Sequence, residues 1–151
     1  KSEKEEIKTV SAWLSEHLKT GVALHEFGVF VRSEAELPRA RAALEAAGIP
    51  FKILDEHVET TSGYASISTM HSAKGLEFRA VVVMACDDEI IPLQKRIETV
   101  GDDADLQEVY DTERHLLYVA CTRARDYLLV TSVHPASEFL DDLKLTDLAS
   151  N

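Results

Sequence analysis

Apolar and polar residues alternate along the chain in blocks that predict helices and strands in turn. Residues 4–18 place apolar side chains at steps of three and four, which is typical of a helix with one buried face. Phe27–Val31 is almost continuously apolar, which favours a strand buried on both faces, as in a parallel sheet. The chain is therefore expected to begin with a helix followed by a central strand.

The next segment predicts a strand–helix–strand unit. Residues 40–47 have a strong helix propensity, and Gly48 is expected to end the helix. Residues 51–54 predict the strand that follows. A strand, a helix and a second strand in this order make a βαβ unit, whose crossover is right-handed in nearly all known cases.

The remaining pattern predicts three more strands and two more helices. The strands are expected at residues 65–68, 80–85 and 127–131, and the helices at residues 105–123 and 137–143. About five strands that alternate with helices indicate one α/β domain over residues 1–151, with a mostly parallel sheet between layers of helices.

The charge of the chain is unevenly distributed. A net charge of −11 argues against a protein that binds polyanions over its whole surface, because phosphate binding needs local positive charge. Seven acidic residues and no Lys or Arg lie within residues 98–113, where we predict an acidic mobile loop that leads into the next helix. The acidic total therefore leaves room for a local anion site elsewhere.

Apolar run lengths and cysteine usage predict a cytoplasmic protein. No apolar run approaches the roughly 20 residues that span a bilayer, and the N-terminus lacks a signal-peptide pattern. Cys86 and Cys121 stand alone in apolar surroundings, so buried reduced thiols are expected rather than a disulfide or a metal site. The chain does not begin with Met, so it is expected to be a piece of a longer protein.

Residues 69–78, Thr-Met-His-Ser-Ala-Lys-Gly-Leu-Glu-Phe, place a polar cluster between two apolar runs. In α/β proteins such a segment forms a working loop at a strand end. His71, Ser72 and Lys74 can donate hydrogen bonds to phosphate oxygens. Gly75 lets a ligand approach the backbone closely, and Glu77 is an acceptor suited to ribose hydroxyls. The loop predicts contact with a nucleotide, a nucleic acid or both. A polar loop that only caps strand ends has the same composition.

A second segment, residues 113–125, ends its helix in Thr122, Arg123 and Arg125. A guanidinium is the natural group for reaching a transferring phosphoryl group, although cations at a helix C-terminus also complement the helix dipole. No Gly-x-x-x-x-Gly-Lys-Ser/Thr is present, so the chain has no P-loop of its own. Three acids at residues 87–89 follow a strand, but a solvated loop is favoured there, and no metal site is predicted.

Taken together, these two segments resemble the C-terminal half of UvrD/Rep/PcrA-type superfamily 1 DNA helicases. Residues 69–78 look like motif V of that family and residues 113–124 look like its motif VI. The strand that ends at Arg32 is similar to the segment that opens the family's second RecA-like domain. The resemblance covers nearly the whole chain and implies the C-terminal RecA-like domain, motor domain 2A, with a three-layer α/β/α sandwich.

The resemblance implies a two-domain motor that binds ATP in the cleft between two RecA-like domains. The first domain, expected N-terminal in the same polypeptide, carries the P-loop, the Mg²⁺-binding acids and the catalytic base, so this chain alone is predicted not to hydrolyse ATP. Arg123 is similar to the family's arginine finger, Glu77 to its ribose-contacting acid and Gly75 to its close-approach glycine. Lys74 is assigned either to the phosphates or to the loop itself.

The other end of the loop matches the part of the family that contacts single-stranded DNA, through Thr69, His71 and Ser72. Besides the absence of the first RecA-like domain, two departures from the family stand out. The family's Tyr-Arg motif before the second domain has no counterpart, and only residues 55–64 fill the place of a large inserted domain. The main interpretation is the C-terminal motor half of an ATP-dependent DNA helicase or translocase, which closes the ATP site and contacts single-stranded DNA. A degenerate, non-catalytic helicase-like domain that binds nucleic acid or protein is the alternative.

Overall fold

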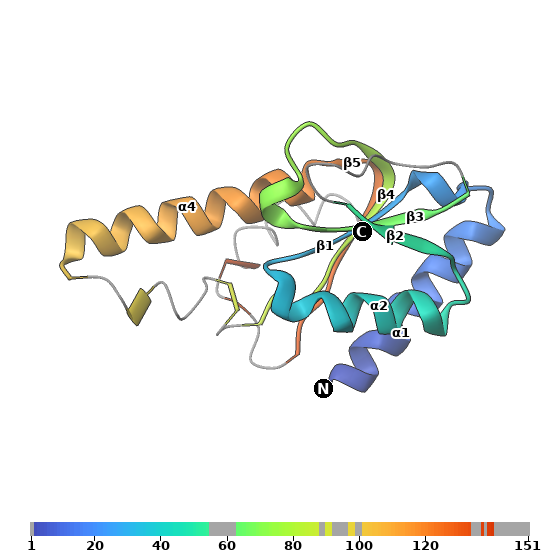
Figure 1. The fold of residues 1–151 in the computed structure, drawn as a ribbon, viewed down its shortest axis with the longest axis horizontal. Coiled ribbons are helices and arrows are strands. Elements are labelled where there is room, and N and C mark those ends of the chain that lie inside the picture. The colour runs from blue at the N-terminus through green and yellow to red at the C-terminus, as the bar shows by residue number, and fades with distance from the viewer. Residues whose placement is uncertain are drawn as a thin grey trace.

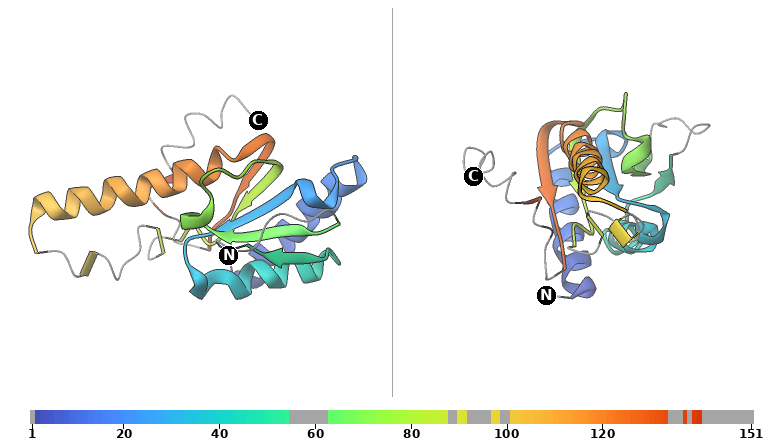
Figure 2. Two further views of the ribbon diagram at one scale, coloured as in Figure 1. Left: turned by 45° about the horizontal axis from the view of Figure 1, so that its top comes forward. Right: turned by 90° about the vertical axis from the view of Figure 1, so that its left-hand side faces the viewer.

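The computed structural model describes residues 2–54, 63–87, 90–91, 97–98, 101–133, 137 and 139–140. These residues form a five-stranded sheet whose paired strands all run parallel, with helices on both faces (Figures 1 and 2). The strand order is β2-β3-β1-β4-β5. The strands are β1 Phe27–Val31, β2 Phe51–Ile53, β3 Ala65–Thr69, β4 Phe78–Val83 and β5 Ala124–Val130.

Helices α1 (Glu3–Lys19) and α2 (Leu37–Ala46) pack on one face of the sheet, and α4 (Asp103–Cys121) packs on the other. Each face has its own apolar core, and β1 lies in the middle of the sheet with all five of its residues buried. Three short 3₁₀ turns complete the described elements: η1 Leu24–Glu26, η2 Glu34–Glu36 and η3 Met70–Ser72. The α/β sandwich predicted from the sequence is confirmed.

Capping explains where the first helix begins. The Ser2 hydroxyl accepts a hydrogen bond from the Glu5 amide at 3.2 Å, and acids in the first turn complement the helix dipole. Val10 and Leu14 then reach the core, as the apolar spacing predicts. The helix expected at residues 4–18 is therefore confirmed within one residue at each end.

The acidic run that precedes motif VI is mostly helical. Asp102 caps α4 by accepting a hydrogen bond from the Asp105 amide at 2.8 Å, and α4 continues without a break to Cys121. The loop predicted over residues 98–113 is wrong for residues 103–113, and the helix that was predicted from residue 105 onward is confirmed instead. Acids at a helix N-terminus stabilise the helix instead of opposing it. The N-terminal part of α4 projects beyond the sheet, which keeps these charges in solvent (Figure 1).

Two further predictions fall on parts of the chain that are barely described. Only residues 137, 139 and 140 represent the helix expected at residues 137–143, and residues 55–62 of the predicted loop before β3 lie outside the described ranges. None of the described helices combines the length and the apolar composition that a membrane-spanning helix needs.

Gly28 in β1 is required because of the ring that lies over it. A Cβ built there would overlap the ring of Phe78, and Phe78 itself packs edge-on against Phe30. Gly28→Ala is therefore expected to lower the free energy of unfolding by about 1–3 kcal/mol through overpacking. Urea unfolding of the purified chain measures this loss. Gly101→Ala is the matched control, because a Cβ at exposed Gly101 meets no atom within 4 Å. An equal effect at both glycines would contradict the steric explanation.

Candidate nucleotide and nucleic-acid interface

The polar loop between β3 and β4 crosses from one edge of the sheet to the other. These two strands flank β1 and run parallel to it, so the loop leaves the carboxyl edge after Thr69 and returns to the amino edge at Phe78 (Figure 1). Between these points Met70 and Ala73 bury their side chains in the core beneath α4. The two ends of the loop therefore lie at opposite edges of the sheet, which divides the predicted site residues into two groups.

Arg123 joins the second segment to the amino-edge end of this loop. It lies between α4 and β5, and its guanidinium donates to the carbonyl oxygens of Leu76 at 3.3 Å and Val119 at 3.1 Å. In return, the Arg123 carbonyl accepts a hydrogen bond from the Phe78 amide at 2.9 Å. The third acceptor for the guanidinium is the Thr122 hydroxyl, at 3.3 Å. All three acceptors are neutral, so they orient the guanidinium without cancelling its positive charge.

The turn beside Leu76 places the other predicted nucleotide residues at the surface. Gly75 has φ +85°, a left-handed conformation that side-chain-bearing residues rarely adopt, and a Cβ there would meet no atom within 4 Å. Its conformation therefore requires glycine, and its backbone lies open to an approaching ligand. Lys74 and Glu77 are exposed on either side. Glu77 Oε1 lies 3.6 Å from Arg125 Nε, an exposed pair of small energetic value.

The carboxyl-edge end of the loop presents the residues predicted to contact nucleic acid. Thr69 ends β3 and is half-buried, His71 is exposed in η3, and Ser72 is half-buried beside it. The ring of His71 does not stand alone at this edge. Its Nε2 lies 3.1 Å from Nη1 of Arg32, the residue that directly follows β1.

Arg32 forms a buried ion pair with Glu113 of α4. The guanidinium donates through Nε to Oε1 at 2.8 Å and through Nη2 to Oε2 at 2.6 Å, which is a two-pronged geometry. The exposed fractions of the two side chains are 3% and 0%. This pair ties the end of β1 to the middle of α4, next to His71.

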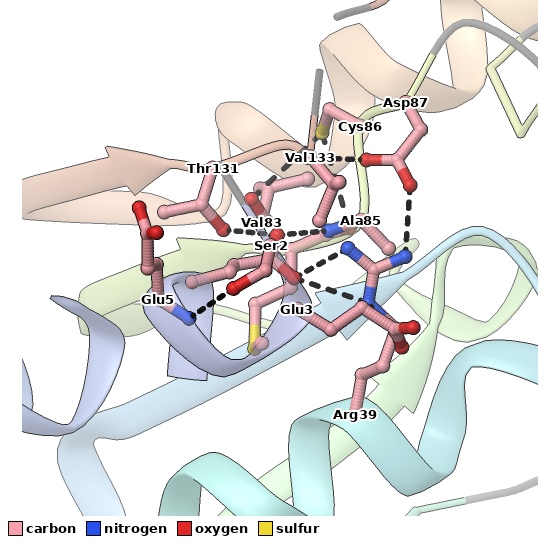
Figure 3. A network of polar contacts seen from close by, with 12 residues as sticks. Ser2, Glu3, Glu5, Arg39, Val83, Ala85, Cys86, Asp87, Thr131 and Val133 are labelled. Atoms are coloured by element: carbon pink, nitrogen blue, oxygen red, sulfur yellow. Dashed lines mark hydrogen bonds and ion pairs between the residues drawn. The ribbon is translucent and has the colours of Figure 1, made fainter. Parts of the chain in front are cut away.

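A second polar network joins helices α1 and α2 to the carboxyl ends of β4 and β5 (Figure 3). Arg39 of α2 lies between the carboxylates of Glu6 and Asp87 and donates to both. Burial alone would lower the pKa of Arg39, but these hydrogen bonds outweigh it, and the pKa is raised. The other donors to the two carboxylates are the Ala85 amide, the Thr131 hydroxyl and the Val133 amide. This network holds helices and strand ends together.

The acids considered for a metal site have another role where they are described. Asp87 accepts hydrogen bonds from Arg39 and the Val133 amide, while residues 88 and 89 lie outside the described ranges. No cluster of three or more His, Cys, Asp or Glu side chains in the described part of the chain is arranged to hold a metal ion.

Both cysteines are buried free thiols, as predicted. Burial raises the pKa of Cys121 to about 12 and the pKa of Cys86 well above its usual value. At neutral pH both side chains are therefore protonated and unreactive, and they serve as small apolar core residues.

Sequence reasoning identified the loop and Arg123 but did not assign Arg32 or Glu113 to the site. One signal was present: Glu113 occupies a position on the apolar stripe of α4, between Val109 and Leu116. A charged residue at a core-facing helical position requires a buried partner.

Comparisons with a family model and with curated proteins point to the same family. The model of the UvrD-like helicase C-terminal domain matches residues 54–134, just over half of the chain. The ATP-dependent DNA helicase UvrD1 of Mycobacterium leprae is 35% identical over 100 residues, and the ATP-dependent DNA helicase PcrA of Staphylococcus aureus strain MRSA252 is 39% identical over 85 residues. These alignments cover 59% and 56% of this chain but only 12% and 10% of the two relatives. The chain therefore corresponds to a small part of each relative's length.

The fold is also similar to that of a solved helicase domain. The crystal structure of the C-terminal domain of a possible DNA helicase from Lactobacillus plantarum WCFS1 superposes with a TM-score of 0.62 at 22% sequence identity. The superposition covers 89% of this chain and 70% of that one. This likeness supports the RecA-like α/β architecture predicted from the sequence.

Proposed function

The chain belongs to the UvrD-like helicase C-terminal domain family, and from this premise we propose that it is the C-terminal motor half of an ATP-dependent DNA helicase or translocase. The observation that carries the proposal is the contact between Arg123 and the Leu76 carbonyl. It brings the arginine of motif VI and the nucleotide end of motif V to one edge of the sheet. The DNA end of motif V lies at the other edge.

At the amino edge, the domain closes an ATP site. Arg123 stabilises the negative charge that develops on the γ-phosphate during transfer, as arginine fingers do. Glu77 accepts hydrogen bonds from the ribose hydroxyls, and the open backbone at Gly75 lets the nucleotide approach closely. Lys74 adds positive charge beside them. Each of these groups is exposed or oriented by neutral oxygens, which fits an anionic ligand that arrives from outside this domain.

The phosphate cradle belongs to another part of the protein. The sequence holds no P-loop, so the N-terminal RecA-like domain of the same polypeptide supplies the cradle and most of the ligands for Mg²⁺. Mg²⁺ held there would supply positive charge to the β- and γ-phosphates. By itself the chain is therefore an incomplete ATPase, and the isolated domain is inactive.

At the carboxyl edge, the domain contacts single-stranded DNA through Thr69, His71 and Ser72. Hydroxyl and imidazole groups donate hydrogen bonds to phosphate oxygens, which positions a strand without reading its sequence. Closure of the ATP cleft moves the amino edge, and the same loop continues to the DNA edge. This connection gives nucleotide binding a physical route to strand movement.

His71→Ala in the full-length protein tests the division of labour along the loop. We expect the dissociation constant for an oligothymidylate to rise about tenfold, because a hydrogen bond to a charged phosphate is lost. The dissociation constant for ATP should change less than about twofold. Fluorescence anisotropy at one fixed salt concentration measures the first quantity, and fluorescent nucleotide titration measures the second.

His25→Ala is the matched control, because His25 is also an exposed histidine in a 3₁₀ turn, η1, which precedes the amino end of β1. It should leave the affinity for the oligothymidylate unchanged. An equal loss of DNA and ATP affinity in His71→Ala would contradict the separation of the two ends of the loop.

A further inference from the structure

Arg32 is held in place by its ion pair with Glu113. Burying two charges is costly, and the pair is tolerated only because two short hydrogen bonds satisfy both carboxylate oxygens. A guanidinium is planar, so fixing Nε and Nη2 on the carboxylate also fixes the position of Nη1. Nη1 is the atom that meets His71.

This contact determines which nitrogen of the His71 ring accepts a hydrogen bond. A guanidinium only donates hydrogen bonds, so Nε2 of His71 must accept at this contact. A neutral imidazole whose Nε2 accepts carries its proton on Nδ1. Arg32 thus holds the ring in one orientation and one protonation pattern, with Nδ1 as the donor nitrogen.

We propose that Arg32, locked by Glu113, is the positioning residue for His71 in single-strand binding. The inference rests on the proposed DNA contact of His71 and adds the groups that orient it. Because Arg32 contacts one nitrogen of the ring, the ring presents the same edge to each strand that binds. The preorganised ring loses less conformational freedom when the strand binds.

The same pair connects His71 to the helix that leads to Arg123. Glu113 lies eight positions before Cys121, the last residue of α4, which corresponds to about 12 Å along the helix, and Arg123 follows two residues later. The helix runs from the carboxyl edge, where Glu113 holds Arg32, to the amino edge, where Arg123 contacts Leu76. A shift of α4 on nucleotide binding therefore reaches the orientation of His71 through one helix and one ion pair.

A double-mutant cycle in the full-length protein tests the positioning role. Arg32→Lys keeps a positive charge for Glu113 but removes the planar fork that also reaches His71. We expect it to raise the dissociation constant for an oligothymidylate by about five- to tenfold. In a His71→Ala background the same substitution should have almost no further effect, because the ring that Arg32 positions is gone.

Arg39→Lys is the matched control, because Arg39 also sits between carboxylates but contacts Glu6 and Asp87 instead of His71. It should leave DNA affinity within about twofold in both backgrounds.

Should Arg32→Lys fail to fold, Glu113→Asp replaces it: the carboxylate is kept one methylene further back, which displaces Arg32. This variant should also weaken DNA binding, and only when His71 is present.

Two results would separate the inference from the proposed function. If Arg32→Lys or Glu113→Asp weakens DNA binding equally with and without His71, the pair is purely structural and the positioning role is overturned. If His71→Ala by itself leaves DNA affinity unchanged, the DNA contact in the proposed function fails, and the positioning role fails with it.

Discussion

Replacing Arg123 with alanine is expected to lower ATP turnover by the full-length protein about a thousandfold, in the range that arginine fingers supply. The guanidinium sits at the end of α4, where three neutral oxygens orient it and leave its charge for the γ-phosphate. Removing it takes away charge stabilisation in the transition state and little of the ground-state binding. We therefore expect kcat to fall far more than KM for ATP rises, in a steady-state assay with saturating single-stranded DNA.

Two further variants make this test specific. Arg123→Lys keeps the charge but not the planar guanidinium that three oxygens orient, so it should recover only a small part of the lost rate. Arg79→Ala removes another arginine near the amino edge, one that is paired with Asp126 at 2.8 Å, and should leave turnover close to that of the unmodified protein. An unchanged rate in Arg123→Ala would rule out the motor role and favour a non-catalytic helicase-like module.

Most of the fold was predictable because local apolar runs carry it. The nearly continuous apolar run at Phe27–Val31 favoured a strand buried on both faces, and β1 is the middle strand of the sheet with all five residues buried. Strand ends were less predictable, because tertiary pairing sets them. For β4, the sequence pattern predicted a start at Ala80, whereas the strand begins at Phe78. The amide of Phe78 donates a hydrogen bond to the Arg123 carbonyl.

The acidic run before motif VI shows a different limit. Its composition is typical of a solvated loop, and the projecting first turns of α4 are indeed solvated. The Asp102 cap and the dipole of a long helix decide the backbone conformation, and neither depends on burial. Charge density indicates exposure here, and it does not distinguish a loop from an exposed helix.

The candidate site, too, was predictable only in part. Contiguous residues of the loop, such as His71 and Glu77, were identified because their chemistry lies within one short segment. The partners Arg32 and Glu113 are 81 positions apart, and a single sequence holds no information on which arginine meets which glutamate. What the sequence does contain is the position of Glu113 on an apolar stripe, which predicts a buried partner without naming it.

That buried position leads to the second large effect, which concerns stability. Glu113→Ala is expected to lower the free energy of unfolding of the chain by about 3–5 kcal/mol, because it leaves the Arg32 guanidinium buried without its carboxylate. Urea unfolding followed by circular dichroism measures the loss. Glu108→Ala, on the exposed face of the same helix, should change stability by no more than about 0.5 kcal/mol.

The double variant Arg32→Met/Glu113→Leu separates the cost of a broken pair from the value of an intact one. Apolar residues of similar volume remove both charges together, so no group is left buried and unpaired, and much of the lost stability should return. If the fold recovers but DNA binding stays as weak as in His71→Ala, the ion pair serves the orientation of His71 more than the stability of the domain. If Glu113→Ala alone lowers the free energy of unfolding by less than about 1 kcal/mol, water reaches Arg32, and the pair is not the buried ion pair that its geometry indicates.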